Sequence, residues 1–306
     1  MTLRKEPLTK KLQTIKVDAR LQISDLIMPI QIIDGYHVKE EIKELPNIYK
    51  YSLDKLLEEV KELHDLGLRK ILLSGPTKIF QKNIADDYDE DDLLQKAIRN
   101  IKQVYPSIDV TCVIDLQLLA NDSTPTDQKL SQQRLLNLLI SIAASYAEEG
   151  VDYIVPCHLQ INDLKVLRQG LDEAGFGSVG ILSDILEYKS SFCVALSNEN
   201  EEKLNLGEIK SALMRAHQVE DDVDGIIIQP SLPILDIIHQ VHNISYVPIT
   251  VFQVGREYAT LKQAIDKNIV SDHVIYDTAL SIKRAGAEQI ITYFAKDLCN
   301  FLLEQN

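Results

Sequence analysis

The sequence contains no tryptophan, only three methionines and only four cysteines among 306 residues. The cysteines are far apart and never form a Cys-x-x-Cys pair, so they indicate reduced thiols rather than a disulfide framework or a zinc knuckle. An apolar run of about 18 residues is absent, and no apolar segment follows the basic start of the chain. We therefore expect a cytoplasmic protein that does not associate with membranes.

Basic charge is also scarce, since 32 Lys and Arg residues stand against 46 Asp and Glu residues, a net charge of -14. This excess of acid repels phosphate backbones, and no basic stripe is interleaved with aromatic residues, so nucleic acid is excluded as a partner. One basic segment exists within the first 20 residues: Arg4, Lys5, Lys10, Lys11, Lys16 and Arg20. Such a run is usually solvated. It could also reach across an acidic neighbouring subunit of a homo-oligomer.

What the chain does have is a regular alternation of short apolar runs and longer segments of helical period. The apolar runs span 26–33, 70–74, 110–115, 153–156, 179–183, 225–229, 248–253 and 289–293. Helical periods lie near 53–66, 91–104, 128–149, 160–174, 206–219, 232–241, 256–267, 272–285 and 295–303. Strands that are each followed by a helix predict an α/β fold, the (β/α)8 TIM barrel. We expect an N-terminal arm over residues 1–24 and a single barrel domain over residues 25–306.

Six segments resemble motifs of the aminolevulinate dehydratase (porphobilinogen synthase) family. They are residues 26–35 (LIMPIQIIDG), 45–54 (LPNIYKYSLD), 174–183 (AGFGSVGILS), 232–238 (LPILDII), 253–259 (QVGREYA) and 281–296 (SIKRAGAEQIITYFAK). The resemblance extends in order over about residues 21–304. It implies the same barrel fold and a lyase of tetrapyrrole biosynthesis.

The resemblance also implies a mechanism that this chain is not equipped to follow. The family joins two aminolevulinate molecules through two lysines that form Schiff bases, which requires lysines with an unprotonated amine. At these positions the chain has Glu187, in Ile-Leu-Glu-Tyr, and Gln229, in Ile-Gln-Pro. A carboxylate and an amide cannot condense with a ketone.

Other family features have changed as well. The segment 115–122 takes the place of the family's metal-binding loop and contains no cysteine or histidine, so the resemblance does not carry the zinc site over. The cofactor is therefore unknown, with a divalent cation at Asp115, His158 and Asp184 as an open alternative. Between Glu187 and Gly207 the family's lid arginines are absent.

Four residues are the substrate-binding candidates that the resemblance implies. Tyr293 keeps the family's residue, whereas Gly255 replaces a serine that binds a substrate carboxylate. Tyr188 and Gln253 are neighbouring positions of the same motifs, and for Gln253 we favour a packing role. Three lysines match helical parts of the family and are interpreted as surface residues: Lys262, Lys283 and Lys296.

Clustered carboxylates beside a histidine at strand ends suit acid–base chemistry or the binding of an amine. We accordingly predict Glu187, Gln229, Asp184 and His158 as the catalytic set of a repurposed enzyme that acts on a small amino or keto acid. One alternative is a non-catalytic subunit or binding protein that uses the family's oligomer surfaces through its arm. The other alternative is an authentic aminolevulinate dehydratase.

Overall fold

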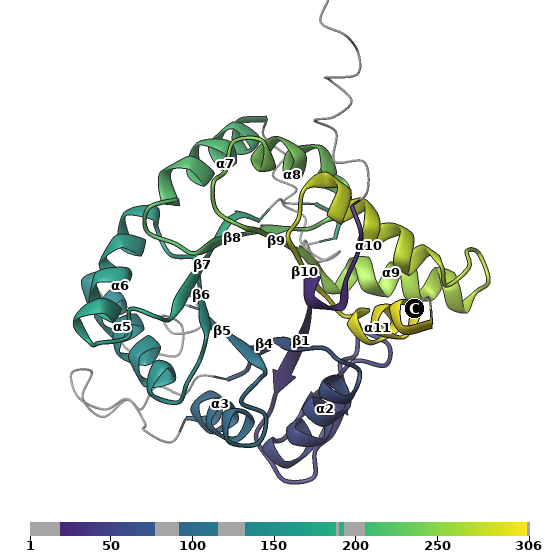
Figure 1. Cartoon of the computed structure of the whole chain (residues 1–306), viewed down its shortest axis with the longest axis horizontal. Coiled ribbons are helices and arrows are strands. Elements are labelled where there is room, and N and C mark those ends of the chain that lie inside the picture. Colours follow the sequence, from purple (N-terminus) through teal and green to yellow (C-terminus); the bar gives the residue numbers. More distant parts are fainter. Residues whose placement is uncertain (1–18, 77–91, 116–131, 188–189, 193–205, 305–306) are drawn as a thin grey trace, which may run out of the picture.

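The computed structural model describes residues 19–76, 92–115, 132–187, 190–192 and 206–304, with the backbone alone at 186–187 and 206–212. Helices surround a ring of parallel strands (Figure 1) in the order β10-β9-β8-β7-β6-β5-β4-β1, and β10 pairs back onto β1. The predicted TIM barrel is thereby confirmed. In the described part of the chain, no helix is both long and apolar enough to cross a membrane.

All the apolar runs predicted as strands form the ring. They are β1 (Leu26–Ile32), β4 (Lys70–Ser74), β5 (Asp109–Asp115), β6 (Tyr153–Cys157), β7 (Gly180–Glu187), β8 (Gly225–Gln229), β9 (Ile249–Gln253) and β10 (Gln289–Thr292). The largest difference from the prediction is at β7, which continues beyond Ser183 as far as Glu187. Glu187, the first of the two positions at which the family has a lysine, is therefore the last residue of a strand.

The predicted helices are present as well. They are α2 (Leu53–Asp65), α3 (Leu93–Val104), α5 (Gln132–Glu148), α6 (Ile161–Glu173), α7 (Leu206–Val219), α8 (Leu235–His242), α9 (Gly255–Asp266), α10 (Val274–Ala285) and α11 (Ala295–Glu304), with short 3-10 turns at Ile23–Asp25 and Leu232–Ile234. In α2, Leu56, Val60 and Leu63 are fully buried, a spacing of four and three residues that turns one face to the barrel. The predicted arm lies outside the described residues up to residue 18.

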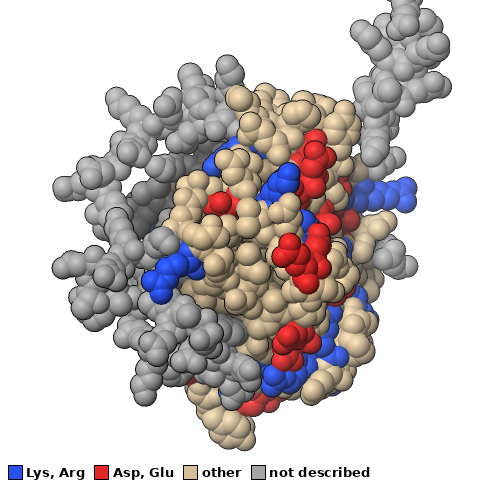
Figure 2. Space-filling model, turned by 90° about the vertical axis from the view of Figure 1, so that its left-hand side faces the viewer, with Lys and Arg blue, Asp and Glu red and all other residues tan. Residues whose placement is uncertain are grey.

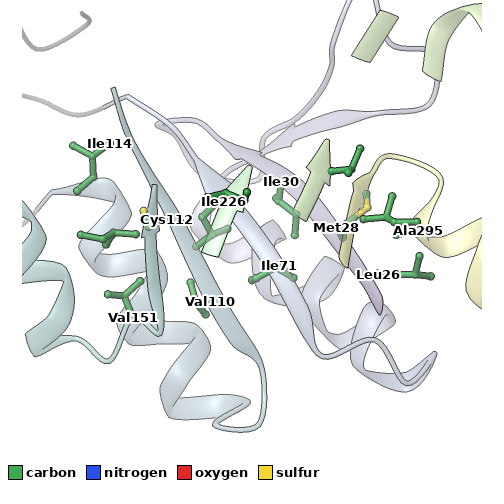
Figure 3. Packing of buried hydrophobic residues seen from close by; sticks show 14 of the residues in the cluster. Leu26, Met28, Ile30, Ile71, Val110, Cys112, Ile114, Val151, Ile226 and Ala295 are labelled. Carbon is green, nitrogen blue, oxygen red and sulfur yellow. The ribbon is translucent and has the colours of Figure 1, made fainter. Parts of the chain in front are cut away.

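Two apolar layers hold the barrel together. The larger fills the space between strands and helices and includes Leu26, Ile71, Val110 and Ile226 of the strands together with Ala295 of α11, which lies near Leu26 and Met28 (Figure 3). The smaller lies inside the ring, with one or two residues from every strand: Ile27, Leu72, Val113, Val155, Cys157, Leu182, Ile227, Phe252 and Ile291. Because side chains alternate along a strand, this inner set shows which residues point to the barrel axis.

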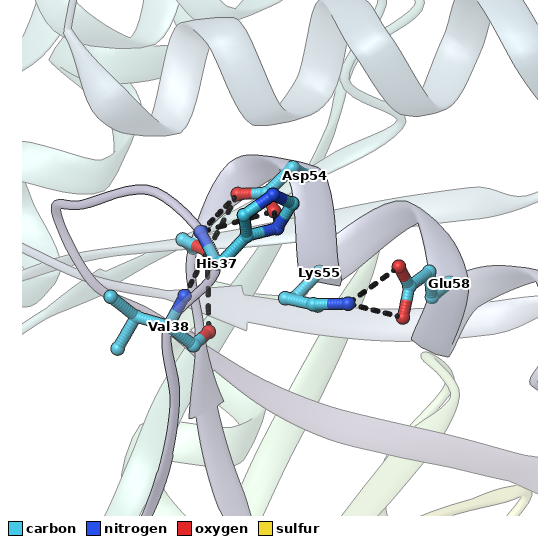
Figure 4. Close-up of polar contacts among 6 residues, drawn as sticks. His37, Val38, Asp54, Lys55 and Glu58 are labelled. Carbon is cyan, nitrogen blue, oxygen red and sulfur yellow. Dashed lines mark hydrogen bonds and ion pairs between the residues drawn. The ribbon is translucent and has the colours of Figure 1, made fainter.

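A small hairpin, which the sequence analysis did not predict, lies beside β1. Strand β2 (Lys39–Glu41) is antiparallel to β3 (Tyr49–Tyr51), which is parallel to the end of β1. The carboxylate of Asp54, in the first turn of α2, accepts the backbone N–H of His37 at 3.1 Å (Figure 4). The hydroxyl of Ser52 donates to Asp54 at 2.7 Å. These bonds fix the hairpin on the start of α2.

The ring closes through very few residues. Only Leu26 and Ile27 of β1 pair with β10, whereas the following part of β1 pairs with β4 and then with β3. Strands β1 and β10 therefore separate toward their carboxyl ends. We call this region the seam.

Candidate functional site

The barrel mouth is defined by the residues that follow the inner apolar set on each strand. Asp115, Asp184, Gln229 and Tyr293 each come two positions after an inner residue, and Cys157 belongs to the inner set itself. Alternation places Asp115, Cys157, Asp184 and Gln229 toward the axis near the carboxyl ends of the strands, where TIM barrels position their chemistry. Tyr293 follows the end of β10 and belongs to the larger apolar cluster. The segments that follow β4, β5 and β7 (77–91, 116–131, 188–189 and 193–205) lie outside the described residues.

Gln229 and Asp184 form a direct contact across neighbouring strands. Nε2 of Gln229 donates to Oδ2 of Asp184 at 2.9 Å. An irregularity in β7 just after Asp184 brings Glu187 into register with Gln229. Thus the two positions where the resemblance implies lysines are cross-strand neighbours, although only the backbone of Glu187 is described.

His158 and Asp115 form a second, looser pair. His158 follows the last residue of β6 with a left-handed φ of 62°. Its Nε2 lies 3.9 Å from Oδ1 of Asp115, too far for a hydrogen bond but close enough for an electrostatic interaction. Both side chains are partly exposed, so they are accessible to a ligand in the mouth.

Cys157 is a mouth residue that the sequence analysis did not select. It is in register with Asp115 on the neighbouring strand, and its side chain is half-buried. The signal that could have identified it is the strand alternation, which places Val155 and Cys157 on one face.

The donor set does not suit the zinc site that the family implies. Within the described residues, no three His, Cys, Asp or Glu side chains come close enough together to hold a metal. Asp115 and His158 approach each other, whereas Asp184 is bonded to Gln229. We therefore assign no step of chemistry to a metal here.

A buried carboxylate fixes the turn that carries Gln229. Glu257 in α9 is fully buried and accepts hydrogen bonds from the backbone N–H groups of Ser231, Leu232 and Val254 and from the Ser231 hydroxyl. Burial raises the pKa of Glu257 more than these hydrogen bonds lower it. Glu257 thus links the segment after β8 to the start of α9.

Tyr293 stands at the border between the mouth and the seam. It is 8% exposed, and its ring lies 6.3 Å from the ring of Phe252 and 5.7 Å from that of Tyr258. Burial raises the pKa of Tyr293 to about 12, so its hydroxyl remains protonated at neutral pH and can donate a hydrogen bond.

The remaining substrate-binding candidates are differently placed. Gln253 points away from the barrel axis, and its Oε1 accepts a hydrogen bond from Thr292 at 2.6 Å. A Cβ on Gly255 would lie 2.8 Å from a terminal methyl of Leu45, so any side chain at this position has to displace Leu45. Tyr188 lies outside the described residues.

The seam contains a cavity of about 210 Å³. Its lining comprises Met28, Pro29, Lys39, Asn47, Ile48, Tyr49, Tyr51, Glu59, Tyr258, Lys262, Tyr293, Lys296 and Asp297. We call it the seam cavity.

The interpretation of Lys262, Lys283 and Lys296 as surface residues is wrong, because their side chains are only 26%, 17% and 25% exposed and each is paired with a carboxylate. Helical period alone does not show which charged side chains are held against neighbouring carboxylates.

Comparison with known proteins identifies the family. The family model described as delta-aminolevulinic acid dehydratase matches residues 1–301. Proteins named delta-aminolevulinic acid dehydratase from Methanothermus sociabilis and Staphylococcus epidermidis are 31% and 32% identical to this chain, with 94% and 96% of both chains covered. The structure of delta-aminolevulinic acid dehydratase (porphobilinogen synthase) from Toxoplasma gondii ME49 in complex with porphobilinogen superposes with a TM-score of 0.81 at 23% identity, covering 99% of this chain and 93% of that one. This chain therefore belongs to the delta-aminolevulinic acid dehydratase family.

Proposed function

We propose that this chain is a divergent member of its family that binds a small amino or keto acid in the barrel mouth and acts on it by acid–base chemistry without an imine. The observation that carries the proposal is the Gln229–Asp184 hydrogen bond, with Glu187 in register beside it. An amide and carboxylates thus occupy the strand ends where the family's chemistry requires two amines.

These groups supply a definite set of interactions. The amide nitrogen of Gln229 has two N–H donors, one of which is used by Asp184, so the other can bind a ketone or carboxylate oxygen of a ligand. Asp184 accepts hydrogen bonds and favours a ligand ammonium group nearby. His158 with Asp115 provides a proton donor or acceptor on the other side of the mouth.

Lys296, the lysine beside Tyr293 in the seam cavity, offers little to an imine mechanism. Lys296 lies in the seam cavity with Tyr293, and its ammonium contacts Glu59 at 2.6 Å and Glu62 at 2.9 Å. Burial alone lowers the pKa of Lys296, but the hydrogen bonds to these two carboxylates outweigh it, so the pKa is raised. A protonated lysine is not a nucleophile.

An authentic aminolevulinate dehydratase is the second candidate, and the full-length similarity to proteins of that name favours it. Borohydride trapping separates the two. The chain is incubated with aminolevulinate and borohydride, and its intact mass is measured together with porphobilinogen formation. We expect no adduct and no porphobilinogen from the native chain, and we expect an adduct from Gln229→Lys, which restores an amine at this position. An adduct on any lysine of the native chain would overturn the proposal in favour of the authentic enzyme.

Calorimetric titration with aminolevulinate tests whether the mouth binds a ligand at all. We expect binding to the native chain and about tenfold weaker binding to Asp184→Asn, because that variant loses the charge that favours an ammonium group. If aminolevulinate, levulinate and 4-aminobutanoate all fail to bind, the hypothesis of a non-catalytic subunit is favoured instead.

A further inference from the structure

We propose that the seam cavity is a second binding site, separate from the barrel mouth, for a small carboxylate-bearing molecule. Its volume of about 210 Å³ is many times the roughly 10–15 Å³ that one water needs. Every residue of its lining is described, and the chemistry proposed for the mouth does not use the cavity. This proposal can therefore be tested independently of the proposed function.

The walls of the seam cavity are fixed by contacts between distant elements. The hairpin is held against β1 by the register pairs of Gln31 with Lys50 and of Ile32 with Tyr51. The hydroxyl of Tyr51 donates to Glu59 of α2 at 2.9 Å. From the other side, the hydroxyl of Tyr258 donates to the backbone carbonyl of Pro46 at 2.6 Å. A cavity with walls held in this way needs little reorganisation to accept a ligand.

Several hydrogen-bond donors of the seam cavity remain open. The buried carboxylate of Glu59 is already occupied by Tyr51 and Lys296. In contrast, the ammonium of Lys39 lies over the Tyr49 ring at 4.5 Å from its centroid and has no carboxylate partner among the described residues. The hydroxyls of Tyr49 and Tyr293 have no hydrogen-bond partner there either. A ligand that accepts hydrogen bonds is therefore the better fit.

The charge of the lining leads to the same class of ligand. Lys262 is paired with Asp266, and Lys296 is paired with Glu59 and Glu62. Lys39 is the lysine of the lining that has no carboxylate partner among the described residues. One carboxylate from a ligand would pair with it.

The other part of the lining is apolar. Met28, Pro29 and Ile48 provide a surface without hydrogen-bonding side-chain groups. Together with the volume, this favours a short-chain monocarboxylic acid whose apolar body lies on these residues. Tyr293 borders both this cavity and the mouth, through its contact with Phe252, so a ligand in the seam would touch a residue that also borders the mouth.

Calorimetric titration of the full chain with butyrate, and with the neutral analogue butanamide, tests the site. We expect butyrate to bind and butanamide to bind at least tenfold more weakly. Lys39→Ala should weaken butyrate binding about tenfold, since it removes the ammonium that has no carboxylate partner. Lys39→Gln, which keeps a donor without the charge, should have an intermediate effect, and Tyr49→Phe should also weaken binding.

Two control variants locate the bound butyrate. Lys55→Ala removes a lysine of α2 that is paired with Glu58 outside the lining, and it should leave butyrate binding unchanged. Gln229→Ala alters the mouth and should also leave it unchanged. The assignment would be overturned if butyrate did not bind, or if Lys55→Ala weakened butyrate binding as much as Lys39→Ala does. It would also be overturned if Gln229→Ala abolished butyrate binding while Lys39→Ala retained it. Circular dichroism of every variant shows whether the fold is intact, and binding that survives in correctly folded Lys39→Ala and Tyr49→Phe would likewise overturn it.

Discussion

Single buried charges decide how the site region is held, and Glu257 is the clearest case. The carboxylate accepts hydrogen bonds from three backbone N–H groups and one hydroxyl, and both Glu257 and Ser231 are fully buried. Removing an acceptor of this kind leaves buried donors unsatisfied, which costs more than the hydrogen bonds contribute on their own. The residue directly after Pro230 depends on this acceptor, and so, through the chain, does Gln229.

The pH dependence of stability tests the role of Glu257. Because its pKa in the folded state is raised, protonation favours folding, so its contribution to stability is greatest at low pH and declines as the pH rises above about 4.3, the ordinary value for glutamate. Glu257→Gln should lack this decline, since an amide keeps an acceptor oxygen without the charge. Glu257→Ala should lose about 3 kcal/mol at pH 7. Urea unfolding between pH 4 and 8 measures both effects, and identical pH profiles for native and Glu257→Gln chains would contradict the argument.

Helix α11 is joined to helix α2 by a partly buried ion pair beside the seam. Lys296 contacts Glu59, whose side chain is 4% exposed, and the more exposed Glu62. This contact connects the last helix of the barrel to the first, across the place where β1 and β10 share only two pairs. Helix packing thus supports the ring where strand pairing is weakest.

Removal of Lys296 should destabilise the chain. Lys296→Met leaves Glu59 buried without its cation, and we expect a loss of about 3 kcal/mol in the free energy of unfolding at pH 7. The double variant with Glu59→Gln should recover much of this loss, because Tyr51 can still donate to the amide oxygen. Because the pKa of Lys296 is raised in the folded state, its contribution to stability is fully present below about pH 10.4, the ordinary pKa of lysine. This contribution disappears as the pH rises through the pKa of the folded state. Urea unfolding at pH 7 and 11 measures the free energy of unfolding of the native chain and of Lys296→Met. If the two chains differed by the same free energy at both pH values, the ion pair would not be the cause.

On the scale of the whole molecule, charge is unevenly divided between the arm and the rest of the chain. The net charge is -14, although the first 20 residues contain six Lys and Arg residues. On the face seen in Figure 2, acidic and basic side chains of the described residues lie interspersed. We propose that the basic arm contacts an acidic partner, for which a second copy of this chain is a candidate.

Deletion of residues 1–20 tests whether the arm holds an oligomer together. We expect light scattering to give a lower mass for the truncated chain than for the full chain, with the difference larger at low salt because salt screens the attraction. A control that replaces the exposed Lys267 by Ala, just after α9 and outside the arm, should leave the mass unchanged. The same mass for full and truncated chains would refute a role for the arm.

Part of the candidate site could be predicted from the sequence. Gln229 and His158 lie where their strands end, because a strand end follows from the apolar run that precedes it, whereas Asp184 lies three residues before the end of β7. Cys157 could have been selected by the same rule. The hairpin could not be predicted from the sequence, because its strands have three residues each and β2 is entirely polar and exposed. It therefore has no burial pattern to detect.

The alternation of apolar and amphipathic segments by itself determined the barrel, because each segment reveals its own buried face and no distant residue is needed to interpret it. Only the tertiary structure decided that Gln229 donates to Asp184 and stands beside Glu187, since this depends on the register between two strands and on an irregularity within one of them. The seam cavity is likewise a tertiary result. It exists because β1 leaves β10 after two pairs, so that side chains from the two ends of the chain meet around the space between them.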